Sequence, residues 1–119
     1  MKTHPNELFF YYAPESNGSK QTRAMAYAIT RHVNEFNFQK ERLTSTAWRT
    51  LLNLLGLRAK DLLNRAHPEY QAKIAGHDFN DEDWINILIN HPYMLKAPIA
   101  VKNNHAVLCK SPNDILKLG

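Results

Sequence analysis

The residues best suited to chemistry lie in one short turn, where an apolar run ends and a helical pattern begins. Pro14 and the pair Asn17-Gly18 are typical turn residues, and Ser19 after them can cap a helix that begins at Lys20. A strand that leads through such a turn into a helix brings unpaired backbone N–H groups and the positive end of the helix dipole to one place. We therefore expect this turn to bind an anion.

A cysteine in such a turn would be reactive, because the same N–H groups stabilise a thiolate and lower its pKa. The turn contains no cysteine, and Cys109, the single cysteine of the chain, follows an apolar run near its end. One cysteine can form neither an internal disulfide nor a Cys-x-x-Cys redox pair. A dithiol mechanism within this chain is therefore excluded, and we expect Cys109 to be a poorly reactive packing residue.

Composition indicates a single globular domain covering residues 1–119, with 44% hydrophobic and 22% charged residues and a net charge of +4. The basic residues are scattered along the chain, which favours a solvated surface over a nucleic-acid footprint. No apolar run approaches the roughly 20 residues of a membrane helix. Residues 1–7 lack the apolar core of a signal peptide. We expect a cytoplasmic protein with no membrane partner.

The first part of the chain predicts a β-α-β unit. Residues 8–12 are apolar or aromatic without interruption, as in a central strand that is buried on both faces. Residues 20–32 have the spacing of an amphipathic helix, and residues 33–38 alternate like a strand with one polar face. By the handedness rule the two strands should be parallel, with the helix on one face.

The rest of the chain predicts a helical insert followed by a hairpin and a last helix. Four helices are expected in the insert, which covers about 44–90, at residues 44–55, 58–64, 68–75 and 80–89. Two strands, 98–102 and 105–109, flank a turn at Asn103-Asn104, and Ser111 can cap a terminal helix. The resulting order is that of an α/β, thioredoxin-like domain with a four-stranded mixed sheet and helices on both faces.

No metal or cofactor site is expected. The acids at the start of the fourth predicted helix, Asp81, Glu82 and Asp83, suit the helix dipole and lack the spacing and glycine of an EF-hand. His67 and His77 lack the spacing and the cysteine partners of a zinc site. His91 precedes a proline at a predicted helix end, where a structural role is favoured.

The last forty residues carry a distinctive motif. His91-Pro92 is followed by Leu95, then by Pro98-Ile99 and Val101. With the upstream stretch 62–65, this motif closely resembles the arsenate reductase (ArsC) and Spx family, and the resemblance extends over nearly the whole chain. It implies a thioredoxin-like fold and a cis peptide bond before Pro98, facing the turn.

The resemblance also implies that the family's chemistry is missing. Ser16 stands where the family has its nucleophilic cysteine, and a serine without a paired base is neither a thiolate nor a redox group. The arginines that hold the oxyanion are replaced as well. Ala97, with Lys96 beside it, precedes the hairpin proline, Lys110 follows the last strand, and Arg65 is displaced by one position.

Two functions follow from this pattern. The first is a catalytically degenerate protein, a binding or regulatory module without thiol redox activity, with a protein partner as Spx-type members have in RNA polymerase. The second is an enzyme of the arsenate reductase-like family that acts on an oxyanion or thiol substrate through the residual pocket. In either case we expect weak, millimolar binding of an inorganic oxyanion. The expected anion-binding residues are Ser16, Asn17, Gly18, Ser19, Lys20, Arg65, Lys96 and Lys110.

Overall fold

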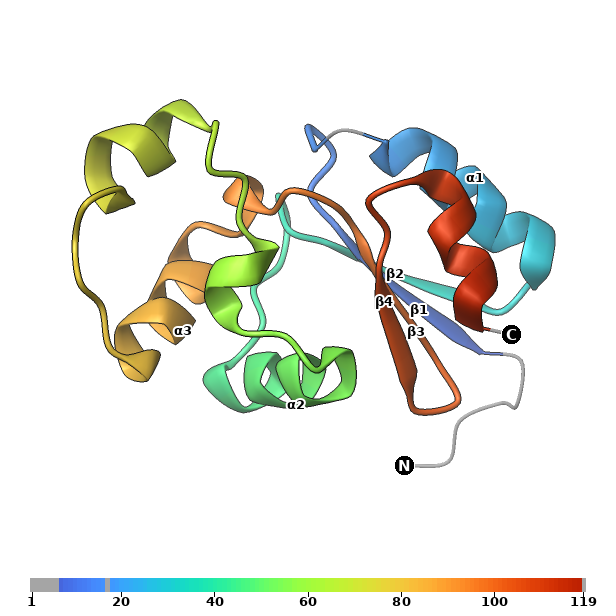
Figure 1. Ribbon diagram of the computed structural model, residues 1–119. Coiled ribbons are helices and arrows are strands. Elements are labelled where there is room, and N and C mark those ends of the chain that lie inside the picture. Colours follow the sequence, from blue (N-terminus) through green and yellow to red (C-terminus); the bar gives the residue numbers. More distant parts are fainter. Residues whose placement is uncertain (1–6, 17, 119) are drawn as a thin grey trace.

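The computed structural model describes residues 7–16 and 18–118 (Figure 1). Its elements follow in the order β1 (Leu8–Tyr12), α1 (Ser19–Ile29), β2 (Val33–Asn37), α2 (Ser45–Leu55), the short helices η1 (Ala59–Leu62) and η2 (Tyr70–Ile74), α3 (Asp81–Asn90), η3 (Pro92–Met94), β3 (Ile99–Lys102), β4 (His105–Leu108) and η4 (Pro112–Leu118). The predicted order of a β-α-β unit, a helical insert, a hairpin and a last helix is confirmed.

The four strands form one mixed sheet in the order β2-β1-β3-β4. β1 is parallel to β2 and antiparallel to β3, and β3 is antiparallel to β4. β1 therefore lies inside the sheet, and Phe10, fully buried, pairs with Glu35 on one side and Ala100 on the other. The predicted central strand and the parallel β-α-β unit are both confirmed.

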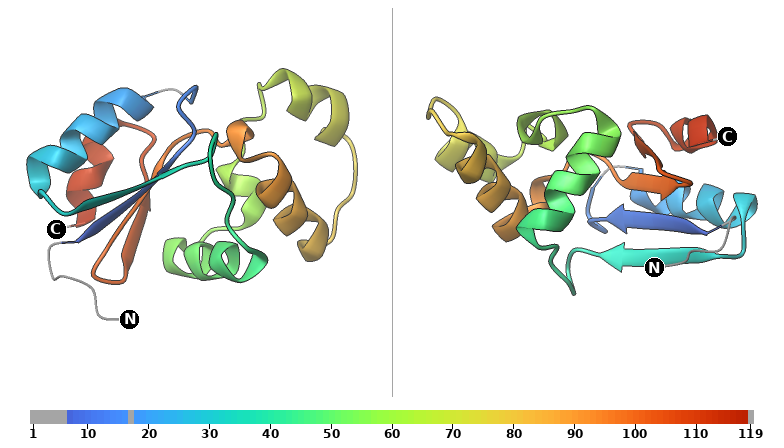
Figure 2. Two further views of the ribbon diagram at one scale, coloured as in Figure 1. Left: turned by 180° about the vertical axis from the view of Figure 1, so that it is seen from behind. Right: turned by 90° about the horizontal axis from the view of Figure 1, so that it is seen from below.

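Helices cover both faces of this sheet. On one face α1 and η4 lie side by side, as Figure 2 shows from two directions, and they pack on Leu8 and Phe10 of β1. The strand residues whose side chains point to the other face of the sheet pack against the helical insert. Ile99 and Leu108 belong there to the same buried cluster as Trp48 of α2 and Leu88 of α3. The alternation of the strands thus divides the core into two clusters that share one sheet.

The two longer helices of the insert begin at side-chain caps. The Thr44 side chain accepts the N–H of Ala47 at 3.1 Å, and Gly56 closes α2 in the left-handed region at φ +66°. α3 begins with a capping box. The Asn80 side chain accepts the backbone N–H of Asp83, and the Asp83 carboxylate accepts the backbone N–H of Asn80. The acids of the first turn therefore serve the helix start.

Three of the predicted helices are not α-helices. η1 and η4 are 3-10 helices, and η2 is a π-helix in which the N–H of Ala75 reaches the carbonyl of Tyr70 at 2.8 Å. Segments this short gain little from helix propagation, so packing and local hydrogen bonds decide their geometry. At η4 the Asp114 carboxylate accepts the N–H of Ser111 at 3.0 Å, which is the reverse of the predicted serine cap.

The hairpin is confirmed, but the expected cis peptide bond is not. Asn103 and Asn104 have φ of 52° and 63°, as the two central residues of a type I′ turn require. The described residues contain no cis peptide bond, so Pro98 follows a trans bond. The trans form is favoured by about 0.5–1 kcal/mol before proline. The Pro98 carbonyl accepts the N–H of Cys109 at 2.8 Å, which extends the β3–β4 ladder.

Candidate anion-binding turn

Three polar groups bond to one another in the turn between β1 and α1. The Ser16 hydroxyl lies 2.9 Å from the carbonyl oxygen of Ala13 and 2.7 Å from the Ser19 hydroxyl, which itself lies 3.1 Å from the same carbonyl. Ser19 is buried and Ser16 half-buried. The two hydroxyls thus fold the turn back onto the end of β1. Within the described residues, neither hydroxyl bonds to a histidine or a carboxylate that could act as a base.

The helix starts one residue earlier than predicted, and its cap is a glycine. Gly18 occupies the N-cap position in the left-handed region at φ +81°, without a side-chain cap, and Ser19 is the first helical residue. Ser19 therefore uses its hydroxyl inside the turn. Its N–H, at 3.3 Å from the Ser16 carbonyl, is also occupied. Fewer backbone N–H groups of the turn are therefore free to bind an anion than the sequence predicts. Asn17, another predicted anion-binding residue, lies outside the described residues.

A cavity of about 390 Å³ opens beside this turn. Its lining comes from β1, the turn, α1 and the end of β2: Tyr12, Pro14, Ser19, Lys20, Arg23, Asn37 and Gln39. Ser19 and Lys20 are the two predicted site residues that line it. The exposed Lys20 ammonium and the Asn37 amide are lining groups that can donate to an oxyanion, whereas the Gln39 amide already donates to the Glu15 carboxylate at 2.6 Å. Arg23 and the two amides were missed because they lie outside the turn in sequence.

The Arg23 charge is already neutralised by an acid. Two guanidinium nitrogens of Arg23 donate to the two oxygens of Glu35, at 2.6 and 2.9 Å, and the hydroxyls of Tyr12 and Tyr27 donate to the same carboxylate. The bond from Arg23 is the main reason that the pKa of Glu35 falls from its ordinary value of 4.5 to about 2. Lys20 is therefore the cation of this cavity without an acidic partner among the described residues.

The three predicted cations from other elements do not join the turn. Lys110 lines a separate cavity with Leu55, Leu57 and residues of β4 and η4. The Arg65 carbonyl accepts a bond from Gln71, and the backbone N–H of Lys96 donates to the Leu62 carbonyl. No hydrogen bond or ion pair joins any of these three side chains to the described residues of the turn. Of the predicted site residues, Ser19 and Lys20 are therefore the ones that line the cavity beside the turn.

Cys109 lies away from the turn, in the cluster between the sheet and α1 with η4. Only 1% of its surface is exposed, and burial raises the pKa of its thiol to about 12. β4 ends at Leu108, one residue before the cysteine, although the N–H of Cys109 continues the ladder to Pro98. The expectation that Cys109 is a packing residue agrees with this environment.

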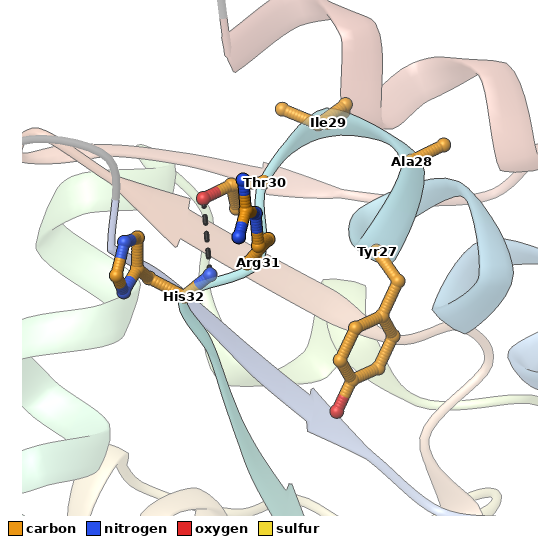
Figure 3. Close-up of a pocket in the computed structure, with 6 residues that line it drawn as sticks. All are labelled: Tyr27, Ala28, Ile29, Thr30, Arg31 and His32. Carbon is orange, nitrogen blue, oxygen red and sulfur yellow. Dashed lines mark hydrogen bonds between the residues drawn. The ribbon is translucent and has the colours of Figure 1, made fainter.

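A larger open cavity of about 510 Å³ lies at the other end of α1, lined by residues 27–32 (Figure 3). Its one drawn hydrogen bond is local, from the N–H of His32 to the Thr30 hydroxyl at 3.1 Å. The side chains of Tyr27, Ile29 and His32 point in different directions and do not converge on a common point. This geometry does not make a binding site.

Over residues 7–16 and 18–118, no three histidine, cysteine or acidic side chains gather closely enough to hold a metal ion. Across the same described residues, no helix has the length and apolar character required to cross a bilayer.

Comparison with known proteins places the chain among arsenate reductase-like folds. The ArsC family model matches residues 11–118. An arsenate reductase from Vibrio cholerae superimposes with a TM-score of 0.85 at 18% identity, over 95% of this chain and 98% of that one. An arsenate reductase (ArsC) related protein from Brucella melitensis gives a TM-score of 0.69 at 14% identity, over 98% and 97%. Among curated proteins no significant match is found.

Proposed function

This chain belongs to the ArsC family, and from that premise we propose that it is a member without thiol redox chemistry that acts as a binding or regulatory module. The observation that carries the proposal is the pair of hydroxyls at the start of α1. Ser16 corresponds to the nucleophile position of the family motif, and its hydroxyl is held by Ala13 and Ser19. A neutral alcohol held in this way cannot form the thiol adduct that arsenate reduction requires.

The single thiol supports the same proposal. Cys109 is buried and its pKa is raised to about 12, so almost none of it is thiolate at neutral pH. It also packs behind the sheet residues Leu8 and Phe10 and does not reach the turn. The nucleophile cannot be supplied from this position without unfolding part of the core.

What the turn retains is a weak anion site. The N-terminus of α1 and the Lys20 ammonium attract negative charge, while the forked arginines of the family are replaced and Arg23 is bound to Glu35. A lysine presents a point charge to an oxyanion and cannot bind it through two parallel hydrogen bonds, as an arginine can. We expect oxyanions to bind with a dissociation constant in the millimolar range, which corresponds to about 4 kcal/mol.

An arsenate reductase assay tests the loss of chemistry. The wild-type chain is incubated with arsenate and either glutathione with glutaredoxin or thioredoxin with its reductase, and arsenite is measured. We expect arsenite at buffer background for the wild type and for Cys109→Ser. Turnover above background that disappears in Cys109→Ser would refute the proposal, and turnover that survives in Cys109→Ser would favour an enzyme that uses the residual pocket.

An amide NMR titration with phosphate, sulfate and arsenate tests the anion site. We expect shifts at residues 16–23 and at the lining residues Asn37 and Gln39, with Lys20→Met weakening the effect and Lys60→Met, at an exposed lysine outside this cavity, leaving it unchanged. No movement there at tens of millimolar anion would mean that the turn is only structural. Capture from a cytoplasmic extract, repeated with the Lys20→Met chain, then tests whether a protein partner uses the same surface.

A further inference from the structure

A second polar cluster lies in the helical insert, on other elements than the turn. The Tyr93 hydroxyl donates to a carboxylate oxygen of Glu69 and lies 2.8 Å from Nδ1 of His91. The same Glu69 oxygen lies 3.9 Å from that imidazole nitrogen. Glu69 caps η2, while Tyr93 belongs to η3 and His91 closes α3. The cluster therefore joins three elements at one point.

The hydrogen bonds in this cluster fix where its protons lie. A phenol has one proton, and Tyr93 gives it to Glu69, so Nδ1 of His91 must carry a hydrogen and donate it to the phenol oxygen. This assignment leaves the other ring nitrogen, Nε2, without a role in the cluster. Partial burial and the bond to Glu69 raise the pKa of Tyr93 to about 12, and the bond from Tyr93 lowers the pKa of Glu69. Glu69 is thus held as a carboxylate.

The cluster lies at the rim of a cavity of about 170 Å³. The apolar part of this cavity consists of Ile74, Phe79, Ile87 and Met94, and its polar part consists of Glu69, Lys73 and His91. A cavity of roughly 150 Å³ holds a molecule of benzene size. The occupant therefore has one small apolar group and a polar end that faces the rim.

The rim carries opposite charges that are not paired with each other. Glu69 and Lys73 lie four residues apart along η2, and both line the cavity. No ion pair within 4.0 Å joins them among the described residues, although the Lys73 charge contributes to the lowered pKa of Glu69. A ligand that bears an ammonium and a carboxylate on one carbon can complement both charges at once.

We propose that this cavity binds a small apolar α-amino acid. The ammonium of the ligand meets the Glu69 carboxylate, its carboxylate meets the Lys73 ammonium, and its aliphatic side chain enters the space between Ile74, Phe79 and Met94. His91 also lines this cavity. The π-helical geometry of η2 supports this assignment, because single π-turns recur at functional sites.

Three probes that share an isobutyl group test the assignment on the full chain by amide NMR titration. L-leucine carries both charges, 4-methylpentanoate lacks the amine, and 3-methylbutylamine lacks the carboxylate. We expect leucine to shift the amides of residues 69–74 and 91–94, and each of the other two probes to bind at least about tenfold more weakly, since each leaves one rim charge unmatched. The resonances of the turn at residues 16–23 should not move, which separates this site from the anion site.

Matched variants test the two charges of the rim. Glu69→Gln and Lys73→Met keep the approximate size of each side chain and should each weaken leucine binding about tenfold. Glu41→Gln and Lys40→Met make the same changes at exposed positions away from the cavity and should leave binding unchanged. Ile87→Ala, which enlarges the apolar part, should shift the preference toward a bulkier amino acid such as phenylalanine.

Three results would overturn the assignment. The first is no shift at residues 69–94 with tens of millimolar leucine, and the second is equal binding of leucine and its two single-charge analogues. The third is a loss of binding in the two control variants as large as in Glu69→Gln and Lys73→Met. Circular dichroism of every variant shows whether the chain is folded, so a loss of binding cannot be confused with unfolding.

Discussion

Ser16 and Cys109 have opposite surroundings, and this difference can be measured with a single substitution. In Ser16→Cys, made in a Cys109→Ser background, the new thiol lies at the start of α1 near Lys20. We expect the pKa of this thiol to fall below the ordinary value of about 8.5, because the helix N-terminus stabilises a thiolate. The rate of iodoacetamide labelling as a function of pH gives the value directly.

The wild-type chain is the control for that experiment. Cys109, with its pKa raised to about 12, should label far more slowly than the new thiol at any pH where the protein is folded. A thiol at position 16 that labels no faster than a thiol in an unfolded peptide would show that the turn no longer stabilises negative charge.

Gly18 decides the backbone path between the turn and α1. A methyl group at this position would meet no atom within 4 Å, so space is not the constraint, but φ of +81° is unfavourable for a residue with a Cβ. We expect Gly18→Ala to lower the free energy of unfolding by about 1 kcal/mol and Gly18→Asn to lower it less, because asparagine tolerates the left-handed region. Urea denaturation measures both variants, and equal losses would contradict the conformational explanation.

The bonds to Glu35 join helix α1 and strand β1 to the edge strand β2. Glu35 accepts bonds from Arg23 and Tyr27 of α1 and from Tyr12 of β1, and its pKa is lowered from 4.5 to about 2. A carboxyl group whose pKa is lowered by folding stabilises the fold at pH values above its pKa in the unfolded chain. This stability is lost as the pH falls from 4.5 toward 2.

Glu35→Gln should therefore lower the free energy of unfolding at neutral pH by about 1 kcal/mol, a modest value because water still reaches the pair. It should also flatten the pH dependence of stability between pH 4.5 and about 2. Glu41→Gln, at an exposed acid that forms none of the described ion pairs, is the control. Identical acid titration curves for Glu35→Gln and the wild type would rule out this role.

The sequence predicts the elements well where a periodic pattern and a cap coincide. α2 and α3 have both: the Thr44 side chain caps α2, and the Asn80 side chain caps α3. η1, η2 and η4 have only short patterns, so tertiary contacts determine whether they are 3-10 or π. The 3-10 and π hydrogen bonds of these short helices leave no signal in the spacing of apolar residues.

The candidate site was predicted in part, for a physical reason. The turn itself is local, so its residue types are enough to place Ser16, Ser19 and Lys20 together. The distances of Arg65, Lys96 and Lys110 from the turn depend on how the insert and the hairpin pack beside it. The order of residues in the sequence does not give these distances. The Glu69, Tyr93 and His91 cluster was missed for the same reason, since its members come from three elements.

On the scale of the whole molecule, the insert and the sheet share one core. Trp48 and Trp84 both lie in the insert, yet their cluster includes Ile99 of β3 and Leu108 of β4. We expect tryptophan fluorescence and far-ultraviolet circular dichroism to give coincident urea transitions, because neither part can expose its core alone. Two separate transitions would show that the insert unfolds independently of the sheet.

The pairing of β1 with β3 has a consequence for synthesis of the chain. Phe9 lies opposite Val101, so the inner strand is synthesised long before one of its two neighbours. Until then the aromatic residues of β1 can pair with β2 alone and leave one backbone edge open, which is the condition under which nascent chains aggregate. The insert then reduces the entropic cost of adding β3, because the N–H of Lys96 bonds to the Leu62 carbonyl and Leu95 pairs with Leu63, just ahead of the strand.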